Sequence, residues 1–553
     1  MKKRFESNTS RWFLSVIFFL SGIALTVLLS LRPMPALYYA VELVLCSIVW
    51  GLIAFKYRIV EKVVQCCEKT DAIFSILLSV AFIPTHYQTL NRLIGLIASK
   101  GESISAAYET YLNLFVTHKQ LFLIPLLTFG AIALCVIFMY ISSRTRKKII
   151  YFFRGISGYE RVFLAVGGVV SAIIIIVLFN QTNVFYLPET DGNLVSFDAL
   201  YTFDSGSLLE TNSYTNPAAP ENDFRQPLFG IFAMPFGLAA KLISYFIPSE
   251  NAYPICCNIL QNILLLITLL LISRMLEVGK EVKIYFLLLS VAAFPYMLFA
   301  LNMEQYIFAL FWTILLIYNS YVHHKTDNVL SVAATGSIMT SALFVIPLMI
   351  INKEHTMFIR KGLKMLAMFL ALFICGGLIE LVYKIKILTS VYMSFFTGNG
   401  FIDKFHQFTH FIVSCFIAPC SQVVENSGSV SYWACPTHTT SIFGIIIFAI
   451  SILSGILFRR KFIAVISIYW AVFALVLICL IGWGTAENGT LLYSLYFFWA
   501  FTVLTVLLTD KLLSVSKLIK RLFFIILIAS LFLYNLYYML DVINFGRLYY
   551  PVL

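Results

Sequence analysis

Long apolar segments with almost no charge recur from one end of this 553-residue chain to the other. Each approaches the roughly 20 residues that an α-helix needs to cross the hydrocarbon core of a bilayer. Within lipid, a single segment satisfies its own peptide groups only as a helix. The strong segments are residues 12–31, 37–55, 121–141, 162–179, 255–272, 284–301, 306–318, 363–382, 442–457, 462–481, 491–508 and 522–540. The weaker candidates are residues 73–97, 228–247 and 329–351. The pattern predicts an all-α polytopic membrane protein with roughly 12–15 membrane segments.

Charge is scarce in the chain and unevenly placed. Only 12% of the residues are charged, whereas a soluble domain has about 25%. The net charge of +12 comes from short basic runs between apolar segments, such as residues 144–148, 360–364 and 517–521. Because Lys and Arg gather on the cytosolic side, these runs predict a multi-pass protein of the plasma (inner) membrane with a cytosolic N-terminus. The basic excess then indicates contact with anionic membrane lipid and not with nucleic acid.

The basic runs also predict which segments cross the membrane. They place two long polar segments, residues 180–226 and 383–440, on the outer side. The apolar segment 228–247 contains Pro235, so we expect it to lie along the outer interface or to dip in and return. The segment 329–351 contains Pro347 and must also return to its starting side, which predicts a broken helical hairpin.

Three parts are predicted along the chain. Residues 1–150 form an N-terminal transmembrane helical module with few polar outer loops. Residues 151–385 form a core that includes the first outer loop, residues 180–226. Residues 386–553 carry the second outer region and the C-terminal transmembrane helices.

Polar chemistry is concentrated in the first outer loop. The strong apolar segments are nearly free of ionisable residues, which disfavours an ionic transport path. The loop itself is acidic, and Phe197, Leu200, Tyr201 and Leu208 predict an amphipathic helix around Asp198 that lies on the membrane surface. This helix would place a carboxylate at the water–lipid boundary, where a lipid headgroup and a soluble acceptor can meet.

Several stretches resemble the GT-C superfamily of polytopic glycosyltransferases, which use polyprenyl-phosphate sugars. Residues 197–214, with Phe-Asp-Ala at their start, resemble that family's acidic first-loop motif and the interfacial helix after it. The run Arg-Gln-Pro-Leu at 225–228 resembles the opening of the next interfacial helix, with Gln226 where the family has Pro. Residues 294–318 resemble its helix–acid–helix hairpin, and residues 335–347 its small-residue hairpin. The resemblance covers roughly residues 160–385 and implies a GT-C-like helical bundle with extracytoplasmic loops and interfacial helices.

The resemblance implies catalytic acidic residues on the outer side. It places the base that removes the acceptor's proton on the first outer loop, where Asp198 is the first candidate and Asp191 the second. Glu304 is a third candidate because it closes an otherwise apolar hairpin, although it could simply mark a helix end. Asp204 is expected to be solvated. Oxygen ligands from Asp191, Asp198 and Glu304 would suit Mg²⁺ or Mn²⁺, and the need for a metal stays open.

Basic and aromatic residues complete the predicted site. Arg225 fits the leaving phosphate best, because a guanidinium binds phosphate oxygens in a bidentate manner. Lys384 and Lys386 follow an outward helix and are alternatives, although lysines there also contact lipid headgroups. Tyr201 would shield Asp198 and contact the substrate.

Histidine and cysteine pairs in the second outer region leave alternatives open. His406 and His410 are four residues apart and could share a helix face. Packing or acceptor contact is favoured over zinc, because Gln407 stands where a metalloprotease motif has Glu. Cys420 and Cys435 could form a disulfide, which their spacing alone does not decide.

The leading hypothesis is therefore a membrane glycosyltransferase with an extracytoplasmic active site. It would transfer a sugar from a polyprenyl-phosphate carrier to a cell-envelope glycan, lipid or protein. The alternatives are a transporter or flippase of lipid-linked saccharides, a glycan polymerase or ligase, and a non-enzymatic membrane scaffold.

Overall fold

The structure is a computed structural model that describes residues 68–84, 87, 119–186, 199–201, 203–216, 225–375, 400–426, 429–435, 438–482 and 491–552. The chain divides into two compact units. The first comprises Met1–Ile156, Asn216–Ala218 and Leu366–Tyr383, and the second comprises Ser157–Thr215, Ala219–Met365 and Lys384–Leu553. The three-part division expected from the sequence stays a prediction.

The first unit contains helices α4 (Lys69–Ala81) and α7 (Lys119–Arg154), which pack together. Asp71 of α4 is 1% exposed and accepts hydrogen bonds from Ser142 Oγ (2.8 Å) and Arg146 Nε (3.2 Å) of α7. The backbone N–H of Glu68 also donates to Asp71 (3.1 Å). A buried carboxylate has to be paired in this way, so these contacts fix α4 against α7.

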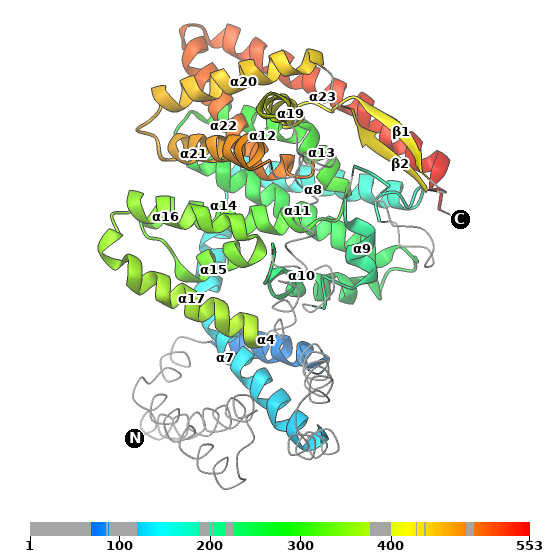
Figure 1. Ribbon diagram of the computed structural model, residues 1–553, viewed down its shortest axis with the longest axis vertical. Helices are drawn as coiled ribbons and strands as arrows, with labels where there is room; N and C mark the ends of the chain where they lie inside the picture. Colours follow the sequence, from blue (N-terminus) through cyan, green and yellow to red (C-terminus); the bar gives the residue numbers. More distant parts are fainter. Residues whose placement is uncertain are drawn as a thin grey trace. The chain divides into compact units, whose positions relative to one another are not determined.

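The other described elements follow in chain order (Figure 1). They are α8 (Gly158–Phe179), α9 (Ser205–Glu210), α10 (Phe229–Ser244), α11 (Ala252–Met275), α12 (Lys280–Ala292), α13 (Phe294–Leu301), α14 (Gln305–His323), α15 (Asn328–Ser337), η1 (Met339–Ser341), α16 (Ala342–Ile351), η2 (His355–Met357), α17 (Phe358–Cys375), α19 (Phe401–Ser414), β1 (Ser421–Asn426), β2 (Ser429–Ala434), α20 (His438–Leu457), α21 (Phe462–Leu475), η3 (Val476–Ile481), α22 (Ser494–Leu512), η5 (Leu513–Val515) and α23 (Lys517–Tyr549).

Six helices among the described residues are long and apolar enough to cross a membrane. They are α8, α11, α14, α21 with η3, α22 with η5, and α23. Helices α12 and α13 make a seventh span if the pair, bent by 58°, counts as one. The chain is thus a mostly helical, multi-pass membrane protein, as predicted, and the expected total of roughly 12–15 segments includes residues outside the described ranges.

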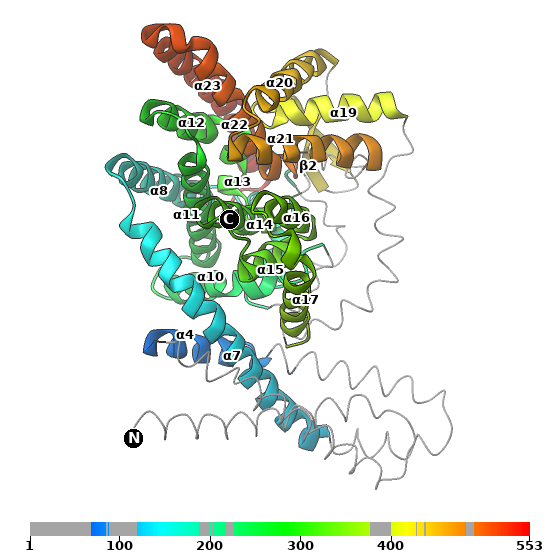
Figure 2. The same cartoon turned by 90° about the vertical axis from the view of Figure 1, so that its left-hand side faces the viewer.

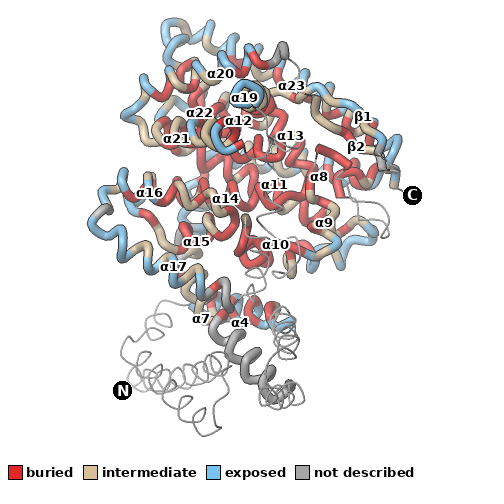
Figure 3. Tube along the Cα trace, viewed as in Figure 1, coloured by how far each residue is buried: buried red, intermediate tan, exposed pale blue. Residues whose placement is uncertain are grey.

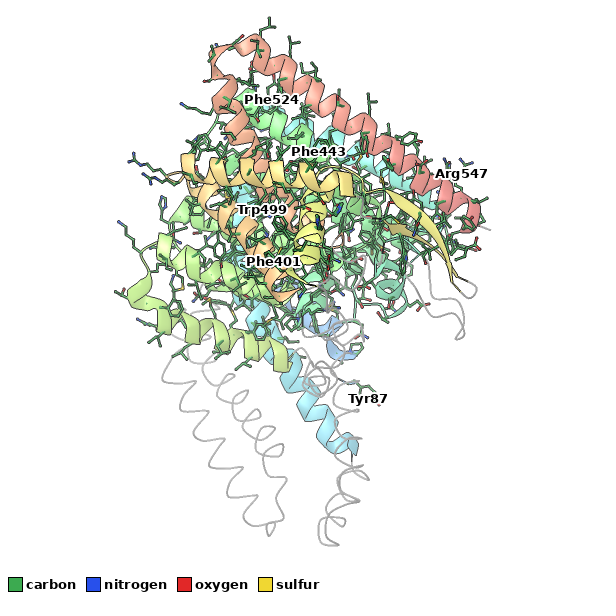
Figure 4. All side chains as sticks on the ribbon, turned by 45° about the horizontal axis from the view of Figure 1, so that its top comes forward. Tyr87, Phe401, Phe443, Trp499, Phe524 and Arg547 are labelled. Atoms are coloured by element: carbon green, nitrogen blue, oxygen red, sulfur yellow. The ribbon has the colours of Figure 1, made fainter. Side chains whose placement is uncertain are left out.

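Helices of the second unit differ in how far they are buried (Figure 3). In the apolar stretch of α11, 78% of the residues are buried, compared with 17% in α8 and 22% in α23. Helix α23 lies beside α12 in both ribbon views (Figures 1 and 2), with Tyr285 stacked on Phe524 at 4.8 Å between ring centroids. In the side-chain view Trp499 of α22 lies among the packed helices, whereas Phe443 of α20 is 60% exposed (Figure 4). Helix α11 is therefore central, and α8 and α23 present most of their surface to lipid.

The second unit has two chemically different ends. At the basic end, Arg274 pairs with Glu160 (2.8 Å) and Lys461 Nζ donates to the carbonyl oxygen of Glu277 (2.9 Å). At the loop end, the hairpin β1–β2, the chain around α9 and the C-terminus come together (Figure 1). Helices α8, α11 and α23 run between the two ends, so the described residues of the first loop and of the β1–β2 hairpin lie at the end opposite Arg274 and Lys461.

Helix α10 does not cross the unit, as expected from Pro235 within it. After α10 the chain reaches Asn251, whose Nδ2 donates to the carbonyl oxygen of Phe179 (3.0 Å) at the loop end of α8. Arg225, which precedes α10, lies within electrostatic range of Tyr306 at the start of α14. The chain on both sides of α10 therefore lies toward the loop end, which agrees with a segment that does not cross, and its place at the outer interface stays a prediction.

Helices α15 and α16 form the predicted broken hairpin. Both of its ends lie together, because the N–H of Thr326 donates to Glu354 Oε2 (3.1 Å) and Asn352 Nδ2 donates to Ser320 Oγ (2.8 Å). At its tip, Ser341 Oγ is hydrogen-bonded to Thr313 Oγ1 (2.6 Å). The tip thus reaches into the unit while both ends stay at the basic end.

Replacing Glu354 by Gln is expected to lower the free energy of unfolding by about 1–3 kcal/mol at neutral pH. Burial raises the pKa of Glu354, but hydrogen bonds from Lys361 and Thr326 outweigh burial and lower the pKa below its usual range. Since the folded-state pKa is depressed, this stabilisation is present above the unfolded-state pKa and is lost as the pH falls through the folded-state value. Denaturation of purified protein in detergent across that acidic range would measure it.

Glu277→Gln, at an exposed position of the same end, serves as the control and is expected to change stability by less than about 0.5 kcal/mol. Equal effects of the two substitutions at neutral pH would contradict a stabilising role for the Glu354 pair.

Candidate functional site

A break between α12 and α13 leads into the turn that carries Glu304. Ala293 is extended (φ −71°, ψ 141°) and Pro295 lies in the first turn of α13, where its missing N–H is tolerated. Asn535 of α23 donates from Nδ2 to the carbonyl oxygens of Ala292 (2.8 Å) and Phe416 (2.7 Å). A side-chain amide therefore satisfies the carbonyl that the break exposes, which in lipid is required.

Side-chain amides of α11 also satisfy the carbonyls at the C-terminal end of α13. The Nδ2 atoms of Asn258 and Asn262 donate to the carbonyl oxygens of Leu301 (2.7 Å) and Ala300 (3.1 Å). All four residues are buried. The turn after α13 is thus fixed to the central helix and not left to solvent.

Gln261 joins this turn to the first loop. Its Nε2 donates to the carbonyl oxygen of Asn302 (2.7 Å), and its Oε1 accepts from the N–H of Glu304 (3.2 Å) and from the hydroxyl of Tyr214 (3.3 Å). Gln261 is 1% exposed. Because both ends of its amide are hydrogen-bonded, Gln261 fixes the position of the Glu304 backbone.

Glu304 itself is completely buried, at 0% exposure. Its Oε1 accepts from the backbone N–H of Asp204 (2.8 Å), in the first loop just before α9. Asp204 is only partly buried, and the expectation that its carboxylate is solvated stays a prediction. Its backbone hydrogen bond attaches the first loop to the Glu304 turn.

Charged and phenolic groups lie around Tyr306, two residues after Glu304. Tyr493, Arg225, Glu304 and Asp204 are all within electrostatic range of the Tyr306 hydroxyl. The rings of Tyr306 and Tyr493 meet edge to face, with 5.7 Å between centroids. We call these five residues the Glu304 cluster. It contains two carboxylates, one guanidinium and two phenols at the loop end.

The tip of the α15–α16 hairpin is hydrogen-bonded to the backbone of residues 225–228. The N–H of Met339 donates to the carbonyl oxygen of Arg225 (2.8 Å), and the N–H of Leu228 donates to the carbonyl oxygen of Gly336 (2.7 Å). A Cβ on Gly336 would lie 2.6 Å from the Leu228 side chain. The backbone of residues 225–228 is therefore fixed on the hairpin tip, which positions Arg225 near Glu304.

Tyr201 has a structural position that differs from its expected one. It is 0% exposed, and its hydroxyl is hydrogen-bonded to Ser421 Oγ of β1 (2.8 Å). Its N–H donates to the carbonyl oxygen of Tyr432 (3.0 Å), and the N–H of Tyr432 donates to that of Ala199 (2.8 Å). These bonds compensate a φ of 52°, which large residues rarely adopt. Burial raises the pKa of Tyr201, so its phenol stays neutral.

The predicted amphipathic helix around Asp198 is accordingly wrong in its described half. Leu200 forms an isolated parallel bridge with Tyr432 of β2, its two neighbours lie in a turn, and helix α9 begins only at Ser205. The sequence pattern failed here because the backbone bonds to Tyr432 come from a segment far along the chain. Asp198 itself lies outside the described residues.

Of the predicted site residues, the structure describes Tyr201, Arg225 and Glu304 and places the last two within electrostatic range of Tyr306. Asp191, Asp198, Lys384 and Lys386 lie outside the described residues, and their roles stay predictions. Among the described residues there is no group of three or more His, Cys, Asp or Glu side chains that could hold a metal. The metal hypothesis stays untested, since two of its three ligands are not described.

The sequence contained a signal for the supporting residues that was not used. Asn258, Gln261 and Asn262 follow helical i, i+3, i+4 spacing in an otherwise apolar segment, so they form one polar face. Intramembrane polar residues of this kind usually serve a site. Tyr306 is two residues from Glu304 in the sequence, but no comparable sequence signal marked Tyr493 as a neighbour of Tyr306.

The two histidines of α19 do share a helix face. Ser441 Oγ of α20 lies 3.2 Å from His406 Nδ1 and 3.4 Å from His410 Nε2. A Cβ on Gly444 would lie 2.1 Å from the carbonyl oxygen of Thr409, so the two helices approach closely. The pair therefore takes part in packing α19 on α20.

The Glu304 cluster combines the groups needed to bind a polar, phosphorylated ligand. A guanidinium binds phosphate oxygens, and carboxylates and phenols accept or donate hydrogen bonds to hydroxyl groups. Buried charges act in a lower dielectric than water, which strengthens both interactions.

No protein-family profile matches the sequence, and neither the curated proteins nor the solved structures contain a match.

Proposed function

We propose that the chain is a membrane glycosyltransferase of the GT-C type. It moves a sugar from a polyprenyl-phosphate carrier to an acceptor hydroxyl of a cell-envelope molecule on the extracytoplasmic side. The observation that carries the proposal is the Glu304 cluster, in which Arg225 and two carboxylates meet under the first loop at the end opposite the basic runs. Charge segregation favours that end as the extracytoplasmic one.

Each group has a role in the proposed reaction. The acceptor oxygen forms the new bond to the anomeric carbon while the bond from that carbon to the carrier phosphate breaks. A carboxylate of the first loop, Asp198 or else Asp191, takes the acceptor's proton. Arg225 stabilises the charge that develops on the leaving phosphate. Glu304 fixes the loop through Asp204 and orients Arg225 by charge.

A divalent cation would add a second stabilising charge at the leaving phosphate. Glu304 is the one described residue of the proposed ligand set, and the Arg225 guanidinium already supplies positive charge near it. The proposal therefore assigns no step to a metal. The polyprenyl chain would occupy the lipid-facing surface beside the cluster.

Replacing the loop base is expected to lower sugar transfer about 10²–10⁴-fold. Purified wild type, Asp198→Asn and Asp191→Asn would be assayed in lipid with radiolabelled polyprenyl-phosphate sugars and an envelope extract as acceptor. Loss in Asp198→Asn alone would assign the base to Asp198, and loss in Asp191→Asn alone would assign it to Asp191. Glu425→Gln, on an exposed position of β1 at the same end, should transfer at the wild-type rate.

A different activity of the folded protein would overturn the proposal. Folded wild type that transfers no sugar from any such donor, yet moves lipid-linked saccharides across liposome membranes, would be a transporter. The absence of both activities would favour a scaffold.

A further inference from the structure

Two cysteines lie directly opposite each other at the base of the hairpin. Strands β1 and β2 pair antiparallel from Ser421↔Ala434 onward. Cys420 precedes β1 and Cys435 follows β2, and the N–H of Cys435 donates to the carbonyl oxygen of Cys420 (2.6 Å). A hydrogen-bonded antiparallel pair has its Cα atoms about 5.5 Å apart, inside the roughly 4.4–6.8 Å range that a disulfide spans.

The two thiols are also accessible, unlike four of the five other cysteines whose side chains the structure describes. Cys420 is exposed and Cys435 is partly exposed, whereas Cys256, Cys257, Cys415 and Cys479 are buried in or beside apolar helices. Burial, and next the nearby Cys420, raise the pKa of the Cys435 thiol. An oxidant in water can thus reach this pair but not the buried cysteines.

We propose that Cys420 and Cys435 form a disulfide bond that closes the base of the β1–β2 hairpin. The oxidant is a disulfide-bearing protein on the loop side of the membrane. The thiolate of Cys420 attacks one sulfur of that disulfide and releases the other as a thiolate. The thiolate of Cys435 then attacks Cys420 Sγ and releases the oxidant's second sulfur. Two electrons and two protons pass to the oxidant, which leaves as a dithiol.

The bond fixes more than the hairpin itself. Strand β2 also pairs with the first loop, through Leu200↔Tyr432 and the two main-chain bonds between Tyr432 and residues 199 and 201. Ser421, next to Cys420, holds the Tyr201 hydroxyl. A slip of one residue in the hairpin would turn these side chains to the opposite face. The disulfide removes that slip and therefore keeps residues 199–201 in register.

Peptide mapping tests the proposal. Protein from cells that form disulfides is denatured near neutral pH in an excess of alkylating reagent, which traps free thiols, and is then cleaved after glutamate, which cuts the chain at Glu425 between the two cysteines. We expect the peptides with Cys420 and Cys435 to remain joined, lighter by two hydrogen atoms than their reduced sum, and to separate on reduction. Cys415 and Cys479 should be alkylated singly and serve as internal controls.

Alkylation of both thiols in untreated protein, and again after incubation with an oxidised dithiol, would refute the proposal. A link from either residue to another cysteine would refute it equally.

A second readout separates the bond from accidental oxidation. Reductant should speed glutamate-specific cleavage at Glu425 in the folded wild type by at least about tenfold. It should leave the rate unchanged in a Cys420→Ser, Cys435→Ser double variant, which already lacks the bond. Equal, reductant-independent rates in both proteins would show that the pair does not constrain the hairpin.

Discussion

Replacing Glu304 by Gln is expected to lower sugar transfer about 10²–10³-fold while the protein stays folded. Glutamine has nearly the same size, and its oxygen still accepts from the N–H of Asp204 (2.8 Å). What the substitution removes is an ionisable carboxyl group that lies, like Arg225, within electrostatic range of Tyr306. In the proposed mechanism, Arg225 then loses the partner that orients it toward the leaving phosphate. Transfer of radiolabelled sugar from polyprenyl-phosphate donors measures the effect.

Two controls distinguish a catalytic role of Glu304 from a structural one. Glu425→Gln removes a carboxylate from an exposed position of the same end, and its transfer rate should match wild type. Unfolding of Glu304→Gln in detergent should resemble that of the wild type. A stable Glu304→Gln variant with full transfer activity would remove Glu304 from the mechanism, and a variant that fails to fold would point to a structural role.

Replacing Gly237 by Ala is expected to lower the free energy of unfolding by about 1–3 kcal/mol. A Cβ on Gly237 would lie 2.3 Å from the carbonyl oxygen of Tyr214 and 2.9 Å from its Cβ. Because the main chain is in the way, either α10 or the first loop has to move. Tyr214 donates to Gln261 (3.3 Å), so sugar transfer should fall as well. Unfolding in detergent followed by tryptophan fluorescence measures the loss.

Gly168 of α8 provides the matched control, because a Cβ there would meet no atom within 4 Å. Gly168→Ala should leave stability unchanged or raise it by up to about 1 kcal/mol, as expected for a helix interior. If Gly237→Ala were as stable as Gly168→Ala, the first loop would not pack on α10 as described.

Much of the helical framework follows from the sequence. Apolar segments of membrane length predicted α8, α11 and α23, because lipid allows few alternatives to a helix. The two returning segments were predicted by counting crossings against the basic runs and by Pro235 and Pro347. These inferences succeed because they depend on local composition and on the solvent, and not on which distant residues meet.

The site was harder to predict because it depends on long-range contacts. Glu304 and Arg225 were selected for their chemistry and their places in predicted outer segments, and both lie within electrostatic range of Tyr306. The hydrogen bond from the backbone N–H of Asp204 to Glu304 could not be predicted from an acidic loop of ordinary composition. The pairing of Leu200 with Tyr432 likewise could not be predicted from the sequence, since neither segment alone has a strong strand pattern.

Asn535 has a consequence for how the chain is made. It satisfies the carbonyl of Ala292, which was synthesised 243 residues earlier, and it also accepts from the N–H of Ala418 (2.9 Å). The ribosome releases the chain from its N-terminus onward. For most of translation, the Ala292 carbonyl at the kink after α12 therefore has no Asn535 amide to donate a hydrogen bond to it. In lipid such an open group costs several kcal/mol. The kinked conformation, and with it the final position of Glu304, therefore becomes favourable only after α23 has entered the membrane.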